Sequence, residues 1–214
     1  MTLEYDRIGI YGGAFNPVHC GHLQVAQAAT QYLGLDVLLW VPTGHAWHKP
    51  VQLVSAKDRV AMLELAFKSV PSMFLEKWRI DTLELDREGA SYTIETLELL
   101  RQKYCAREWF LLIGADQLLK FQTWERWRDV VQYSKLAVVD RPGAVRDAVA
   151  GVVPGLEWVS VPFEQVDVSS SRIRELLNLC SVDSVNCVAA QEELNKSLPC
   201  GVLAYIQKHH LYEV

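Results

Sequence analysis

The 214-residue sequence lacks any long apolar run and any export signal. No stretch approaches the roughly 18 apolar residues that a membrane-spanning helix needs. The first residues, MTLEYDRIGIYGG, also lack the cationic start and apolar segment of a signal peptide. We therefore expect a cytoplasmic protein that has no membrane as a partner.

Positive charge is scarce as well. Lysine and arginine together number 21, against 26 aspartate and glutamate residues, so the formal net charge is -5. A chain with this balance has no overall attraction for nucleic acid, and we expect none as a partner. An anionic ligand would need cations or backbone N–H groups placed locally.

The cysteines form no pattern that holds a metal ion or a disulfide framework. They are five in number, without a C-x-x-C pair: Cys20, Cys105, Cys180, Cys187 and Cys200. This spacing predicts reduced thiols and no zinc site. The acidic residues are not clustered either, so we expect no metal site made by the protein itself.

What is present is an alternation of strand and helix patterns. Short apolar runs predict strands at 7–11, 36–43, 74–80, 109–116, 135–142 and 156–162. Helical spacing predicts helices at 21–33, 56–69, 92–103, from 169 onward, and at 202–208. Ser55, with Asp58 three residues later, is expected to cap the second helix.

This alternation predicts an α/β fold with a Rossmann-like doubly wound parallel sheet. We expect one domain over residues 1–214, with a Rossmann-like core at about 6–165 and a small C-terminal helical region at about 167–214. Ligands of such a sheet bind at the carboxyl ends of its strands.

The first strand leads into a chemically distinctive loop. Gly12 and Gly13 allow the backbone to approach a ligand, and the next helix begins near Gly21 with its N–H groups pointing to the same place. His19 and His22 flank that helix start and are suited to donate hydrogen bonds to phosphate oxygens. The segment is neither a Walker A loop nor a G-x-G-x-x-G motif. The alternative is that both histidines only cap or pack.

The segment GGAFNPVHCGH resembles the signature of the H-x-G-H nucleotidyltransferase superfamily, and VSSSRIR at Val168–Arg174 resembles its second element, I-S-S-T-x-I-R. The family's threonine is Ser171 here, which keeps the hydroxyl. Three hydroxyls at a helix start can bind an anion, and Arg174 one turn later can fork onto a phosphate. Taken alone, the serines would be an ordinary N-cap.

The whole chain resembles the bacterial nicotinate mononucleotide adenylyltransferase family through three further segments, SYTIETL, IGADQLLKFQTW and RPG. The resemblance implies that Tyr92, Thr93 and Trp124 surround the pyridine ring and that Arg141 meets the mononucleotide. It also implies an ATP site made of Gly12, Gly13, Phe15, Gly114, Asp116, Ser169, Ser170 and Ser171.

Each of these assignments has a plainer alternative. Trp124 and Trp127 are three apart on an expected helix, so at least one of them should simply pack. Tyr92 and Thr93 can merely start a helix, and Arg141 can belong to a surface turn before its proline.

A basic loop, HAWHKP, follows the second expected strand and resembles the family's P-H-[KR] loop. Its Lys49 is expected to meet the triphosphate as a point charge, although a lone loop lysine is usually solvated. The family often has proline where this chain has Trp47, which leaves the loop's conformation open.

The expected reaction is adenylyl transfer from ATP to nicotinate mononucleotide, which gives deamido-NAD and pyrophosphate in NAD biosynthesis. The catalytic residues would be His19, His22, Lys49 and Arg174, acting by positioning and charge stabilisation, with Mg²⁺ bound mainly through ATP phosphates. Open alternatives are nicotinamide mononucleotide as acceptor, a pantetheine-phosphate adenylyltransferase or cytidylyltransferase, and a non-catalytic nucleotide-binding protein. A homo-oligomer also stays open.

Overall fold

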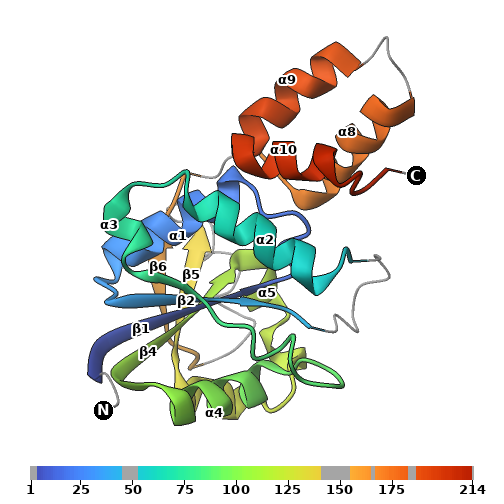
Figure 1. The fold of residues 1–214 in the computed structure, drawn as a ribbon. Coiled ribbons are helices and arrows are strands. Elements are labelled where there is room, and N and C mark those ends of the chain that lie inside the picture. The colour runs from blue at the N-terminus through green and yellow to red at the C-terminus, as the bar shows by residue number, and fades with distance from the viewer. Residues whose placement is uncertain (1–3, 45–52, 141–154, 165–166, 183–186, 214) are drawn as a thin grey trace.

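One parallel sheet forms the centre of the molecule. The computed structural model describes residues 4–44, 53–140, 155–164, 167–182 and 187–213. The strands of the six-stranded sheet follow the order β3-β2-β1-β4-β5-β6, and all pairs are parallel (Figure 1). They are β1 (Glu4–Gly13), β2 (Val37–Pro42), β3 (Trp78–Ile80), β4 (Cys105–Gly114), β5 (Lys135–Asp140) and β6 (Trp158–Pro162). This order confirms the expected Rossmann-like doubly wound fold. The strands follow one another outward in both directions from the neighbouring pair β1 and β4, which is the point where the strand order reverses.

Helices cover both faces of the sheet (Figure 1). One face packs against α1 (Cys20–Tyr32), α2 (Ala56–Phe67) and α3 (Ser72–Leu75). The other packs against α4 (Thr93–Lys103), α5 (Ala115–Leu119), the 3₁₀ turn η1 (Phe121–Thr123) and α6 (Trp127–Tyr133). The chain ends in α8 (Ser170–Val182), α9 (Cys187–Ser197) and α10 (Cys200–Lys208), which lie beside α1 and α2.

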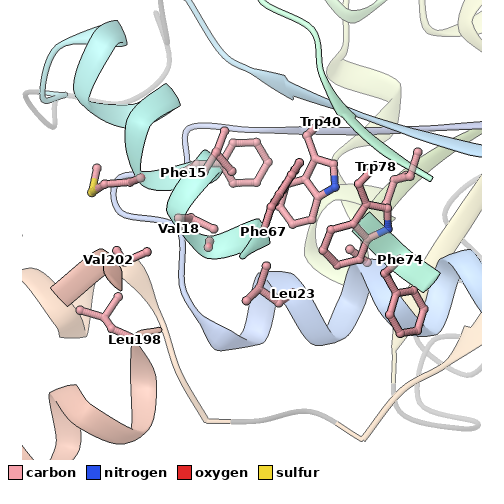
Figure 2. Close-up of a cluster of buried hydrophobic side chains, with 14 of the residues drawn as sticks. Phe15, Val18, Leu23, Trp40, Phe67, Phe74, Trp78, Leu198 and Val202 are labelled. Carbon is pink, nitrogen blue, oxygen red and sulfur yellow. The ribbon is translucent and has the colours of Figure 1, made fainter. Parts of the chain in front are cut away.

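An aromatic cluster anchors the first loop to the core. Trp40 of β2 is fully buried, and its ring centroid lies 5.2 Å from that of Phe15 and 5.2 Å from that of Trp78. Figure 2 shows the same cluster continuing to Leu198, between α9 and α10, and to Val202 of α10. Because close packing resists displacement, the loop that carries Phe15 is held by the core of the protein.

Three expected elements differ from the structure. Only 78–80 of the predicted strand 74–80 is extended, because Pro71 starts the short helix α3, in which Phe74 turns inward. The predicted strand 109–116 ends at Gly114, whose extended backbone caps α5, so Asp116 is helical. The third is the helix expected to carry both Trp124 and Trp127: Trp124 follows η1, whereas Trp127 begins a separate helix, α6.

The remaining elements match closely. The helix expected at 56–69 spans Ala56–Phe67, and Ser55 caps it by accepting from the backbone N–H of Asp58 at 3.1 Å. The strand expected at 135–142 spans Lys135–Asp140, and residues 141–142 lie outside the described residues.

Candidate active site

The first loop, residues 14–18, joins β1 to α1 and sets the geometry of both histidines. His19 is the N-cap of α1, and its backbone N–H donates to Nδ1 of His22 at 3.2 Å. The two rings lie 3.7 Å apart, centroid to centroid. Because Nδ1 of His22 accepts a hydrogen bond, the neutral ring carries its proton on Nε2. His22 is thereby prepared as an Nε2–H donor.

His19 lies in a drier environment than His22. Only 7% of its surface is exposed, and burial lowers its pKa to about 4, so the ring is neutral at pH 7. Its Nδ1 atom is buried without a hydrogen-bond partner among the described residues. His22 is half-buried, with its ring 5.2 Å from that of Phe15.

The glycines of the first motif have different roles. A Cβ on Gly12 would meet nothing within 4 Å, which leaves that backbone open to a ligand. A Cβ on Gly13 would come within 3.0 Å of the Phe15 ring, and one on Gly21 within 2.8 Å of Cγ1 of Val168. Gly21 therefore allows the segment before α8 to pack against the start of α1. Phe15 itself is buried, so only its backbone can face a ligand.

The two sequence motifs meet in the structure. Ser170 Oγ donates to the carbonyl oxygen of Pro17 at 3.0 Å. Arg174 Nη1 donates to the carbonyl oxygen of Asn16 at 2.7 Å, and its Nη2 to Oγ of Ser171 at 3.2 Å. Among the described residues these bonds use two of the five guanidinium N–H groups, and the other three can be donated to a ligand. The first loop and the start of α8 thus form one surface.

Ser169 performs the capping role that the plainer alternative predicts. Its Oγ accepts from the backbone N–H of Arg172 at 3.2 Å. In both Ser169 and Ser171 the hydroxyl oxygen acts as the acceptor, so the O–H proton can still be donated to an anion.

A cavity of about 400 Å³ opens at the carboxyl ends of β1 and β4, where the strand order reverses. It contains two of the predicted ATP-binding residues, Gly114 and Asp116, together with Tyr11, Val25, Leu112, Ile113, Ala115, Val139 and Phe163. Most of these side chains are apolar, and Asp116 is the acidic one. A cavity of this kind suits an aromatic, hydrogen-bonding ligand.

Comparison with known proteins decides the family. The model of the cytidylyltransferase-like family matches residues 10–176. A probable nicotinate-nucleotide adenylyltransferase of Bordetella parapertussis is 36% identical, over 96% of this chain and 98% of the relative. The Gloeobacter violaceus protein of the same name is 37% identical, over 98% and 97%. The chain belongs to the nicotinate-nucleotide adenylyltransferase family.

Solved structures of adenylyltransferases share the fold. The nicotinic acid mononucleotide adenylyltransferase of Plasmodium falciparum, complexed with NaAD, superposes with a TM-score of 0.76 over 97% of both chains at 19% identity. A putative nicotinate-nucleotide adenylyltransferase from Vibrio parahaemolyticus gives 0.65 at 18% identity, over 97% of this chain and 95% of that one.

The residues expected at the pyridine ring lie on the opposite face of the sheet from His19 and His22. Tyr92 is the N-cap of α4, and Thr93 is its first residue. Trp124 ends η1 and packs on Phe121 with ring centroids 5.3 Å apart. Tyr92 and Trp124 are both partly exposed at the edge of the same core cluster, whereas His19 and His22 belong to the α1 side.

Lys49, with its neighbours His45, Trp47 and His48, lies outside the described residues, and so does Arg141. Their roles stay predictions from the sequence.

Arg59 on α2 supports the site and is not among the residues expected there from the sequence. Its Nη1 donates to the carbonyl oxygens of Ala14, at 3.0 Å, and Thr43, at 2.8 Å, joining the ends of β1 and β2. The residue is 2% exposed, and burial lowers its pKa. Arg59 shares a helix face with Met62 and Leu63, and an arginine on an apolar stripe was the available signal.

Within the described residues, no three His, Cys, Asp or Glu side chains are grouped so that they could hold a metal ion. Each helix in the described part of the chain is too short or too polar to cross a bilayer.

Proposed function

We propose that the chain transfers the adenylyl group of ATP to nicotinate mononucleotide, forming deamido-NAD and pyrophosphate in NAD biosynthesis. The observation that carries this proposal is the union of the two motifs, in which Asn16 and Pro17 of the first loop accept hydrogen bonds from Arg174 and Ser170. The end-to-end similarity to relatives named nicotinate-nucleotide adenylyltransferase supports the same reaction.

The proposed chemistry needs no protein nucleophile. An oxygen of the mononucleotide phosphate attacks the α-phosphorus of ATP in line, and the bond from that phosphorus to the bridging oxygen of the β-phosphate breaks. The electron pair leaves with pyrophosphate, and no proton has to be removed from the attacking phosphate. Catalysis is then a matter of position and charge stabilisation.

The donors of the site have corresponding roles. His22 Nε2–H would stabilise charge that develops on the transferring phosphate, assisted by neutral His19. Arg174 would hold the β- and γ-phosphates from one side and Lys49 from the other. The open backbone at Gly12, together with Gly13, the hydroxyls of Ser169 and Ser171 and the backbone N–H of Ser170, would supply further donors.

The two substrates would occupy two sides of one crevice. The cavity with Gly114 and Asp116 is suited to the nucleoside of ATP, and Tyr92, Thr93 and Trp124 on the α4 side are suited to a pyridine ring, with Arg141 near its phosphate. Their reacting phosphates would then meet above β1 and β4, at the first loop.

Mg²⁺ is expected to enter with ATP. The ion would be held mainly by phosphate oxygens of ATP and by water. Bound there, the ion would offset the charge of the departing pyrophosphate. The cytoplasmic location and any homo-oligomer stay predictions from the sequence.

A pyrophosphate-release assay tests the proposal. The chain, ATP and Mg²⁺ are incubated with nicotinate mononucleotide, nicotinamide mononucleotide or phosphopantetheine in parallel, and product mass is measured. We expect the highest kcat/KM with nicotinate mononucleotide. A preference for nicotinamide mononucleotide would change the assigned acceptor. If no pyrophosphate is released with any acceptor, the result would favour a non-catalytic nucleotide-binding protein.

A further inference from the structure

Tyr212 lies in the C-terminal segment after α10, in a backbone conformation that needs an explanation. Its φ is +67°, and that of His210, two residues earlier, is +51°. Residues with a Cβ adopt this left-handed region rarely, and a bulky side chain stays there only when its surroundings hold it. Leu211 and Tyr212 pack against the core cluster of the α1 and α2 face, so this segment is docked on the body of the protein.

The hydroxyl of Tyr212 reaches the first loop. It donates to Oδ1 of Asn16 at 2.9 Å, across 196 positions of sequence. The same Oδ1 accepts the backbone N–H of Val54 at 3.2 Å, while the Asn16 carbonyl oxygen accepts Arg174. Three segments distant in sequence therefore converge on Asn16, which is 2% exposed.

These contacts determine how the Asn16 amide is oriented. With Oδ1 turned toward its two donors, Nδ2 is buried and has no partner among the described residues. A buried donor without a partner is costly, so this orientation persists because both Oδ1 contacts favour it. The neighbouring residue Phe15 also has a positive φ, +46°, which means that the first loop is itself held in an uncommon conformation.

Burial keeps the Tyr212 hydroxyl protonated. Burial is the largest influence and raises the pKa of the phenol, while the nearby guanidinium groups of Arg174 and Arg59 act in the opposite direction. Because burial prevails, the hydroxyl keeps its proton at physiological pH and can donate it to Asn16.

We propose that Tyr212 is a positioning residue for ATP binding, which holds the first loop through Asn16 so that Arg174 faces the triphosphate. This inference rests on the proposed function and adds a residue beyond position 176, where the match to the cytidylyltransferase-like family ends. Tyr212 itself need not touch either substrate.

The test is Tyr212→Phe, which removes one oxygen atom and keeps the ring in the core. We expect the KM for ATP to rise about tenfold, equivalent to about 1.4 kcal/mol, with kcat and the KM for nicotinate mononucleotide within about twofold of the unaltered chain. Calorimetric titration with a non-hydrolysable ATP analogue should show the same loss of affinity without turnover.

Tyr205→Phe is the matched control. Tyr205 also lies in the C-terminal region, and its hydroxyl also donates to another element, but to Oδ1 of Asp58 at 3.0 Å and not to Asn16. We expect this variant to keep the KM for ATP. An equal increase in both variants would mean that any loosening of the C-terminal region weakens ATP binding, and it would overturn a specific role for Tyr212.

A double-mutant cycle with Arg174→Ala separates positioning from general stability. If Tyr212 acts through Arg174, Tyr212→Phe should change ATP affinity less than about twofold once Arg174 is absent. Independent, multiplicative losses would contradict the proposal. The unaltered chain is assayed first: if it releases no pyrophosphate, the proposed function fails, whereas an active chain with an unchanged Tyr212→Phe variant refutes only the role of Tyr212.

Discussion

Arg174 and Asn16 are joined by a 2.7 Å hydrogen bond between residues 158 positions apart in the sequence. The bond holds the guanidinium against the first loop before any nucleotide arrives. A ligand that meets a preformed donor loses less side-chain freedom on binding, so this contact should contribute to affinity for ATP.

Arg174→Ala should therefore raise the KM for ATP by about tenfold or more, since both a charge and a forked donor are lost. Steady-state kinetics with ATP varied at saturating mononucleotide measures the change. Arg172→Ala is the control, because Arg172 is on the same helix but exposed and paired with Glu193. Equal KM values in the two variants would argue against a phosphate role for Arg174.

His22→Ala should lower kcat by roughly 10² to 10³-fold, the usual cost of removing one preorganised donor to a charged transition state. Thermal melting should change little, because the ring is only half-buried. His209→Ala serves for comparison, since His209 is exposed and stacks on Tyr205. An unaltered kcat in His22→Ala would remove this residue from the mechanism.

The pKa of His19 makes a prediction about stability and pH. Burial lowers it from 6.5 to about 4, so between these pH values the unfolded chain binds a proton that the folded chain does not. The contribution is complete above pH 6.5 and is lost as the pH falls toward 4, by up to about 3 kcal/mol. Urea unfolding of the unaltered chain and of His19→Gln, followed across this range, should show the weaker pH dependence in the variant. Parallel curves would show that His19 does not titrate in this way.

Alanine at two of the glycines should affect different properties. A Cβ on Gly44 would overlap the carbonyl oxygen of Glu84, so backbone has to move, and Gly44→Ala should lose at least about 2 kcal/mol of unfolding free energy. Gly12→Ala meets open space and should melt normally while binding ATP more weakly. Denaturant titration and ATP binding together check the pair, and a normally stable Gly44→Ala protein would contradict the expected clash.

Much of the fold could be predicted because strands and helices alternate with clear periodicity. The predicted strand and helix bounds were wrong where one residue overrides that periodicity. Pro71 began a short helix inside an apolar run, and Gly114 ended β4 before Asp116. Trp124 follows η1 and Trp127 begins α6, so the two tryptophans do not share a helix although their spacing suits one.

The candidate site was predictable only where its chemistry is local. His19, His22 and the serine segment carry recognisable spacing, and the structure joins them. Asn16 and Tyr212 act through carbonyl or amide contacts between distant segments, and such contacts leave no periodic trace in a sequence. Arg59 leaves only its place on the apolar face of α2, which does not reveal the two carbonyl oxygens that it bonds.

The dependence of the first loop on α8 has a consequence for synthesis on the ribosome. All six strands precede α8 in the chain, so the sheet and both histidines are made before Ser170 and Arg174. Domains can fold while the chain is still emerging, and a nascent sheet could form its core at that stage. It would still lack the groups that complete the phosphate site. Truncated chains that end before α8 should therefore bind little of the ATP in the cell.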